Sequence, residues 1–197
     1  MTEFSKLPTL LDTERICNLI KYSKRAARVD DTSSFCEFGV YKGGSLEILA
    51  LFNPGKSIFG VDSFEGLPAP TEKDFHSEGE FGDVDRMAIT GYFKTLYPNV
   101  RILKGFSPAV FSFFDQHSRF SFVHVDVDMY SSVIDACDFF YPRMVNGGII
   151  IYDDYGFTST PGSKNAIDEF YKDLSPQFKG EISDMDGVSN KQYIIIK

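Results

Sequence analysis

The chain has 197 residues, of which 43% are hydrophobic and 24% are charged, and its formal net charge at pH 7 is -8. This composition fits one globular domain with a full core and excludes disordered and fibrous chains. The acidic balance argues against a nucleic-acid partner, because such binding depends on clustered Lys and Arg. We therefore expect a single domain over residues 1–197.

Apolar runs alternate with helical patterns along the chain. Residues 1–32 predict an N-terminal helical segment, whose basic cluster from Lys21 to Arg28 is interpreted as a solvated helix face. Ser132, with Asp135 three residues later, indicates a capping box at the start of a helix. The final segments, 181–187 and 191–197, predict a closing pair of strands in an antiparallel hairpin. The other predicted strands are 33–40, 56–62, 99–105, 120–128 and 147–154, and the other predicted helices are 45–52, 86–96, 108–114, 131–142 and 162–173.

This alternation predicts an α/β fold with a mostly parallel sheet covered by helices on both faces. Ligands in such folds bind beyond the carboxyl ends of the strands, where the strand order reverses. The polar, Gly- and Pro-rich stretch 63–85 is a candidate lid, with a disordered surface excursion as the alternative. Three cysteines without a CxxC pattern and the lack of a leader-like or membrane-spanning apolar run favour a cytoplasmic location without a membrane partner.

The first strand ends in the glycine-rich turn EFGVYKGGS, residues 37–45. Glycines at such a turn let a ligand approach the backbone closely, but the spacing is not the GxGxxG of dinucleotide-binding turns. Glu37 would repel a pyrophosphate and attract an ammonium group, and Asp62 ends the second strand where a carboxylate accepts hydrogen bonds from a ribose. An ammonium and a ribose together indicate S-adenosylmethionine. The alternative is that Glu37 and Asp62 only cap strand ends.

Two acidic pairs end two further strands. Asp126 and Asp128 project to the same side of their strand, together with His124, and Asp153 and Asp154 end the strand GGIIIYDD. If these strands are neighbours, each pair of carboxylates at ~4 Å repels by roughly 4 kcal/mol at a dielectric of about 20. Such a cluster needs a cation or bound protons, and oxygen ligands without cysteine favour Mg²⁺, Mn²⁺ or Ca²⁺ over zinc. Helix capping by Asp128 and an Asx-turn at Asp154 are the alternatives.

The turn at residues 37–45 resembles motif I of class I methyltransferases, in the ExGxYxGxS form of catechol-type O-methyltransferases. The stretches VDSFEGLP, HVDVDMY, IYDDY and GSKNAIDEF are similar to those of the macrocin O-methyltransferase family, which methylates sugar hydroxyls on antibiotics. The resemblance covers roughly residues 35–172. It implies a Rossmann-like, mostly parallel seven-stranded sheet with a C-terminal antiparallel hairpin, and a homodimer.

The resemblance also implies roles for individual residues. Glu37 would contact the methionine end of S-adenosylmethionine, Asp62 the ribose, and the strand exit at residues 104–107 the adenine, with Asp128 as general base. The implied metal ligands are Asp126, Asp153 and Asp154. The implied cofactor-binding residues are Glu37, Phe38, Gly39, Val40, Tyr41, Gly43, Gly44, Ser45, Asp62, Ser63, Phe64, Gly105, Phe106, Ser107 and Asp126.

The expected activity is metal-dependent methyl transfer from S-adenosylmethionine to a hydroxyl of a sugar or similar small metabolite. A bound cation would stabilise the alkoxide, and a carboxylate would accept the proton while the oxygen displaces S-adenosylhomocysteine in line. A glycosyltransferase that uses a DxD motif and a non-catalytic cofactor-binding scaffold are the alternatives. The family's usual DGD is DVD here, at residues 126–128, and the identity of the acceptor stays open.

Several side chains outside these motifs carry further expectations. His124 is interpreted as a buried histidine bonded to a neighbour, with ligand or base as the alternative. His76 and His117 are expected at the surface. The aromatic residues named as candidates for the wall of a substrate pocket are Phe81, Tyr92 and Tyr155.

Overall fold

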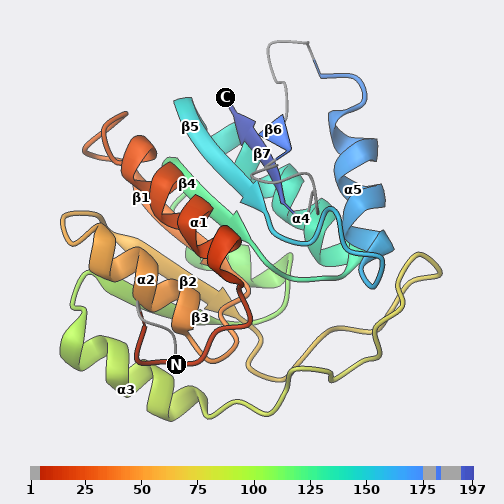
Figure 1. The fold of residues 1–197 in the computed structure, drawn as a ribbon, viewed down its shortest axis with the longest axis horizontal. Coiled ribbons are helices and arrows are strands. Elements are labelled where there is room, and N and C mark those ends of the chain that lie inside the picture. Colours follow the sequence, from red (N-terminus) through yellow and green to blue (C-terminus); the bar gives the residue numbers. More distant parts are fainter. Residues whose placement is uncertain (1–4, 175–180, 183–191) are drawn as a thin grey trace.

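The computed structural model describes residues 5–174, 181–182 and 192–197 (Figure 1). Seven strands form one sheet in the order β3-β2-β1-β4-β5-β7-β6, in which β7 alone runs antiparallel to its neighbours. The predicted C-terminal hairpin is confirmed by β6 and β7, although its connection at residues 183–191 lies outside the described residues. The strands are β1 (Ser34–Phe38), β2 (Ile58–Asp62), β3 (Val100–Lys104), β4 (Phe120–Val125), β5 (Met144–Tyr152), β6 (Glu181–Ile182) and β7 (Tyr193–Ile196).

Helices cover both faces of the sheet, as predicted (Figure 1). One apolar cluster joins the first three helices to the sheet, and a second cluster joins the last two helices and the short helix η1 to its other face. The helices are α1 (Thr13–Ala26), α2 (Gly44–Phe52), α3 (Arg86–Leu96), α4 (Tyr130–Phe140) and α5 (Pro161–Tyr171), with the 3₁₀ helices η1 (Ala109–Phe113) and η2 (Tyr141–Arg143).

The central strands are mostly apolar and buried because both of their faces are covered, with Glu37 of β1 and Ser121 and His124 of β4 as buried polar exceptions. All six residues of β4 are buried. Phe122 of β4 packs against Phe35 of β1 at 5.3 Å between ring centroids on one face, whereas Val123 and Cys36 belong to the cluster on the other face. This alternation follows from the period of two along a strand, and it explains why Phe-rich runs suit the centre of the sheet.

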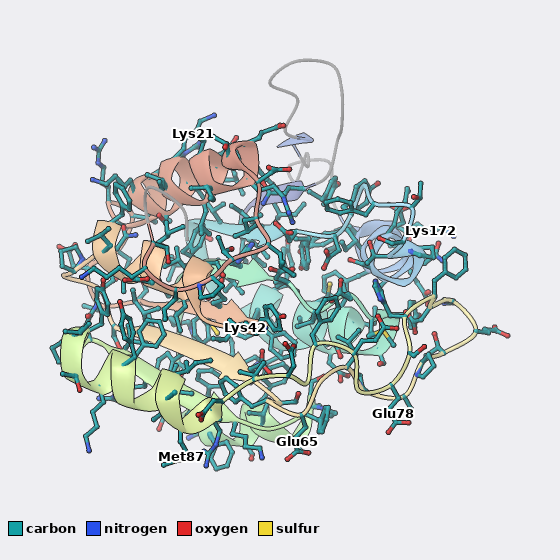
Figure 2. All side chains as sticks on the ribbon, turned by 60° about the horizontal axis from the view of Figure 1, so that its bottom comes forward. Lys21, Lys42, Glu65, Glu78, Met87 and Lys172 are labelled. Carbon is teal, nitrogen blue, oxygen red and sulfur yellow. The ribbon has the colours of Figure 1, made fainter. Side chains whose placement is uncertain are left out.

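Residues 63–85 contain no helix or strand, but the segment is bonded to the rest of the fold. Asp74 accepts a hydrogen bond from the backbone N–H of Tyr130 at 2.8 Å, and Lys73 pairs with Glu169 of α5 at 3.2 Å. Closer to α3, Asp83 pairs with Lys42 at 2.6 Å. The segment therefore runs past the first turn of α4 and reaches the last turn of α5, and Glu78 projects outward from its loop (Figure 2).

The capping box predicted at Ser132 and Asp135 is wrong. Helix α4 begins at Tyr130, two residues before Ser132, and its N-cap residue Met129 provides no side-chain hydrogen bond. The carboxylate of Asp74 instead takes the free N–H of Tyr130 at the helix N-terminus, where a negative charge is stabilised. A cap that comes from a distant loop leaves no mark in the local sequence.

The basic cluster at Lys21 to Arg28 lies on the end of α1 and the turn that follows it, with its charged side chains exposed, and Lys21 points away from the sheet (Figure 2). All three cysteines are free, with Cys36 and Cys137 buried and Cys17 exposed. No helix among the described residues has the length and apolar character that a membrane span requires.

Candidate active site

The strand order reverses between β1 and β4, and a cavity opens there at the carboxyl edge of the sheet. The backbone of Phe38 pairs with that of Val125, so the residues that follow the two strands emerge side by side. The cavity is lined by the turn after β1, the exits of β2, β3, β4 and β5, part of the 63–85 segment and residues before α1. The expected cofactor-binding residues in this lining are Phe38, Gly39, Val40, Tyr41, Gly44, Ser45, Asp62, Ser63, Gly105, Phe106, Ser107 and Asp126.

Three of the expected cofactor-binding residues are not part of the cavity lining. Glu37 is fully buried behind the lining, Gly43 is the N-cap of α2, and Phe64 packs into the apolar cluster with 6% of its surface exposed. Phe64 follows Asp62 by two residues, but its positive φ of 52° turns the chain there. Its side chain therefore points into the core.

Gly39 is the position at which two strand exits come closest. Its φ is 99°, in the left-handed region that favours glycine, and a Cβ built on it would lie 1.7 Å from the carbonyl oxygen of Asp126. Backbone groups from β1 and β4 thus meet without a side chain between them, which leaves the surface beside Gly39 open to a ligand.

Replacing Gly39 with alanine should lower the free energy of unfolding by about 3 kcal/mol, because the added Cβ requires both a strained φ and a displaced Asp126 backbone. Urea unfolding followed by circular dichroism measures this loss. Gly91→Ala is the matched control, since Gly91 lies in α3 with open space around it. That variant should gain about 0.5–1 kcal/mol. Parental stability of Gly39→Ala would contradict the prediction.

Asp62 fastens the glycine turn to the end of β2. Its Oδ2 accepts hydrogen bonds from the backbone N–H groups of Val40 at 2.7 Å and Tyr41 at 2.8 Å, and its Oδ1 accepts one from Phe64 at 2.6 Å. The alternative of a capping role is therefore real for Asp62. The carboxylate also lines the cavity, and Oδ1, which accepts a single hydrogen bond, retains a lone pair that could accept a further one.

Glu37 is joined to the acidic cluster through His124. Its Oε1 lies 3.0 Å from Nδ1 of His124, and Nε2 of the same ring lies 3.4 Å from Oδ1 of Asp153, all three side chains being fully buried. Burial alone would lower the pKa of His124, but the hydrogen bonds and charges of Asp153 and Glu37 raise it to about 10. A buried imidazolium thus links the turn after β1 with the end of β5.

Oε2 of Glu37 is buried and makes no hydrogen bond within the described part of the chain. An unpaired buried carboxylate oxygen is costly, and burial raises the pKa of Glu37. The atom is a natural acceptor for a donor that comes from a ligand.

The structure brings the four aspartates of the two strand ends together. Carboxylate oxygens of Asp126, Asp153 and Asp154 all lie within 4.8 Å of one another. Asp154 also accepts a hydrogen bond from the backbone N–H of Asp128 at 3.1 Å, and Asp128 adopts a positive φ of 57°. Asp126, Asp128 and Asp154 line the cavity.

Crowding and burial disturb the titration of this cluster. Burial, with the charges of Asp153 and Asp154, raises the pKa of Asp126 far above its ordinary value, and Asp154 shifts in the same direction. Burial and the charges of Asp126 and Asp153 raise the pKa of Asp128 to about 8. The protein alone therefore holds protons here at neutral pH. A divalent cation bound by the same hard oxygen ligands would replace those protons.

Asp153 differs from the other three aspartates because the protein already satisfies its carboxylate. Arg15 of α1 pairs with Oδ2, and Gln192 donates to Oδ1 at 2.6 Å beside His124. Burial would raise the pKa of Asp153, but the hydrogen bond and charge of His124, followed by the charge of Arg15 and the bond from Gln192, keep it below its ordinary value. Because its oxygens already accept these bonds, Asp153 has fewer free lone pairs for an ion than Asp126 and Asp154, and it is also absent from the cavity lining.

Sequence patterns did not single out Arg15 or Gln192. Arg15 lies in a helix that carries several basic residues, and Gln192 precedes the last strand. Both are recognised only once the fold places them on Asp153. Arg15 also donates to the backbone oxygen of Leu10 at 2.6 Å and lies 5.1 Å from the ring centroid of Phe157.

The expected surface position of His76 is wrong. His76 lines the cavity with 20% of its side chain exposed, and its Nδ1 lies 2.7 Å from Oε2 of Glu80. Phe81 lines the cavity as expected. Tyr92 and Tyr155 are not in the lining: Tyr92 donates to Glu47, and Tyr155 stacks on Tyr193 and donates to Asp168.

Comparisons with known proteins agree with this architecture. A family model described as macrocin-O-methyltransferase (TylF) matches residues 6–190. The mycinamicin III 3''-O-methyltransferase of Micromonospora griseorubida is 26% identical over 180 residues, covering 82% of this chain and 69% of that protein. Among solved structures, the O-methyltransferase NovP has a TM-score of 0.77 at 20% identity and covers 96% of this chain and 81% of its own. The calicheamicin methyltransferase CalS11 has a TM-score of 0.70 at 17% identity and covers 94% and 80%.

Proposed function

The chain belongs to the macrocin O-methyltransferase family, and from this premise and its cavity we propose that it methylates a sugar hydroxyl with the help of a divalent cation. As a member it is an S-adenosylmethionine-dependent O-methyltransferase. The observation that carries the proposal is the shared cavity: the glycine turn with Asp62 and the carboxylates of Asp126, Asp128 and Asp154 line the same cavity.

We place S-adenosylmethionine along the turn after β1. The close approach allowed at Gly39 and the unpaired oxygen of Glu37 favour its methionine end there, and Asp62, fixed by three backbone N–H groups, is positioned to accept hydrogen bonds from the ribose. The strand exit at residues 105–107 would contact the adenine. Because Glu37 lies behind the lining, its contact with the ammonium group requires a water molecule or a small side-chain movement.

Asp126 and Asp154 are the proposed principal ligands of Mg²⁺, or of Mn²⁺ or Ca²⁺, with Asp153 as a third ligand that Arg15, His124 and Gln192 orient. When bound, the ion would lower the pKa of the acceptor hydroxyl and neutralise the clustered carboxylates. Support from hydrogen bonds behind the ligands is usual at metal sites. The buried position of Asp153 suits this supporting role.

Asp128 is the proposed general base. It lines the cavity beside Asp154, and a pKa of about 8 makes its carboxylate a better proton acceptor than an ordinary aspartate. The acceptor hydroxyl would give its proton to Asp128 while its oxygen attacks the methyl group of S-adenosylmethionine in line with the departing sulfur. A bond forms between this oxygen and the methyl carbon. The bond between that carbon and the sulfur breaks, and the sulfur keeps its electron pair.

The acceptor is proposed to be a sugar, because relatives in the comparisons carry sugar-directed names. The protein of Micromonospora griseorubida is a mycinamicin III 3''-O-methyltransferase, and one CalS11 structure is described as a TDP-rhamnose 3'-O-methyltransferase. The cavity gives little support to a glycosyltransferase. Among its described lining residues Arg15 is the only Arg or Lys, and its charge is already paired with Asp153, so the diphosphate of a sugar nucleotide, whether donor or acceptor, would have only the proposed cation as a positive partner.

Calorimetry and a methyl-transfer assay test the proposal together. We expect binding of S-adenosylhomocysteine with micromolar affinity, and Mg²⁺-dependent methylation of at least one member of a panel of methyl glycosides, TDP-sugars and a catechol. Mass spectrometry of the products locates the methyl group. Tight UDP-sugar binding without affinity for S-adenosylhomocysteine would contradict the cofactor assignment, and methylation of the catechol alone would contradict the sugar assignment.

A further inference from the structure

Residues 5–11, here called the N-terminal strap, form part of the wall of the cofactor cavity. The chain passes α2 before it enters α1, as the dark red trace in Figure 1 shows. Pro8, Thr9 and Leu10 line the cavity next to Gly44 and Ser45 of the glycine turn. The strap therefore closes the side of the cavity on which we place the methionine end of S-adenosylmethionine.

One buried carboxylate holds the start of the strap. Oε2 of Glu47, in α2, accepts hydrogen bonds from Oγ of Ser5 at 2.7 Å and from the backbone N–H groups of Lys6 at 2.8 Å and Leu7 at 2.9 Å. Its Oε1 accepts hydrogen bonds from the hydroxyls of Tyr92 at 2.6 Å and Tyr97 at 3.1 Å. Five donors thus converge on one side chain, three from the strap and two from Tyr92 of α3 and Tyr97 directly after it.

The glycine turn is shaped to receive the strap as well as a ligand. The backbone N–H of Gly44 donates to the carbonyl oxygen of Pro8 at 3.1 Å, and a Cβ on Gly44 would lie 2.5 Å from that oxygen. At the other end of the strap, Arg15 donates to the carbonyl oxygen of Leu10. The strap is therefore fixed at its start, middle and end.

A buried carboxylate such as that of Glu47 is an uncommon way to hold a loop in place. Glu47 is 3% exposed and makes no ion pair among the described residues, so five neutral donors alone compensate its burial. Leu10 is 66% exposed, so the part of the strap that lines the cavity gains little from apolar burial, whereas Leu7 and Leu11 pack into the apolar cluster of α1 and α2. Without the carboxylate, two strap N–H groups would lose their partners and return to water.

We propose that Glu47 is a positioning residue for cofactor retention, which holds the N-terminal strap against the glycine turn so that bound S-adenosylmethionine leaves slowly. Glu47 lies in α2 rather than in the cavity lining, and it acts through Pro8, Thr9 and Leu10. The inference rests on the proposed placement of S-adenosylmethionine in this cavity. It assigns the residue a role in the dissociation rate and none in the chemical step.

The test measures S-adenosylhomocysteine binding to Glu47→Ala and Glu47→Gln by calorimetry and stopped-flow displacement. Glu47→Ala should raise Kd about tenfold, mostly through a faster dissociation rate, as expected from the loss of several hydrogen bonds. Glu47→Gln should stay within about threefold of the parent, because its amide oxygen can still accept from the strap while its NH₂ group faces the tyrosines. Ser5→Ala, which removes one donor, should fall between them and serves if Glu47→Ala does not fold.

Met144→Ala is the matched control. Met144 is a buried residue at the first position of β5, at the opposite edge of the sheet from the cavity, so its truncation lowers stability without touching the strap. At a temperature where both variants are fully folded, Met144→Ala should bind with the parental Kd. Parental affinity of Glu47→Ala, or an equal loss in Met144→Ala, would overturn the inference. Failure of the parent itself to bind would instead contradict the proposed cofactor site.

Discussion

Replacing Asp128 with asparagine should reduce methyl transfer ~10²- to 10⁴-fold, the range typical for loss of a general base. Asn has nearly the shape of Asp and tolerates the positive φ of 57° at this position, so the backbone N–H that bonds to Asp154 is retained. The affinity for S-adenosylhomocysteine should stay within about threefold of the parent, since Asp128 is not among its proposed contacts. Single-turnover rates and calorimetry separate the two quantities.

The pH profile distinguishes loss of a base from general damage. In the metal-free protein the pKa of Asp128 is about 8, so its carboxylate becomes a proton acceptor as the pH rises toward that value. A bound cation would move this limb to lower pH. The rising limb should be present in the parent and absent in Asp128→Asn. Asp138→Asn, on the exposed side of α4, is the matched control and should keep both the rate and the profile. A rate in Asp128→Asn above about a tenth of the parental rate would assign the proton transfer to another group.

The fold follows from the sequence because its signals are local and repeated. The largely apolar run that forms β4 and the alternation of strands with helices are typical of a sheet covered on both faces. Acidic residues at the ends of β4 and β5 then had to meet at one edge, because parallel neighbours end on the same side. Gly39 adopts a positive φ in the turn after β1, and the glycine itself indicates this conformation in the sequence.

The partners of the site residues were not predictable in the same way. The sequence predicts Asp153 as a metal ligand without other partners. In the fold it is bonded to Arg15 and Gln192, which are separated from it by 138 and 39 positions along the chain. Tyr92 looked like a pocket wall because an aromatic residue fits either a pocket or a hydrogen bond, and its hydroxyl instead bonds to Glu47. Such long-range pairs depend on the packing of whole elements and leave no periodic signal in the chain.

Chelation of divalent ions should abolish most of the activity. Asp154→Asn should weaken Mg²⁺ binding by at least ~10- to 100-fold, which is the loss typical when only a residue that hydrogen-bonds a metal ligand is replaced. Asn at this position keeps an oxygen that can accept from the N–H of Asp128, so the local backbone is preserved. Calorimetry with Mg²⁺ alone measures the affinity without relying on turnover. Asp138→Asn again serves as the matched control, because its charge change lies outside the cluster.

The protons held by the cluster provide an independent measure of the same site. The folded-state pKa of Asp128, about 8, is raised above the ordinary value of 3.8, so this group favours the folded state below pH 4 and loses that contribution as the pH rises toward 8. Asp126 and Asp154 shift in the same direction. In the presence of chelator, the cluster should therefore lower the melting temperature as the pH rises from 5 to 8.

Saturating Mg²⁺ should remove most of that slope, since the ion stabilises the ionised carboxylates in place of protons. Binding of Mg²⁺ near pH 7 should then release protons, which calorimetry detects as a heat that depends on the ionisation enthalpy of the buffer. Asp154→Asn should release fewer protons than the parent because one of the protonated carboxyls is gone. If Mg²⁺ neither binds nor changes the pH dependence of melting, the cluster works through its protons alone, and Asp128 must activate the acceptor without a cation.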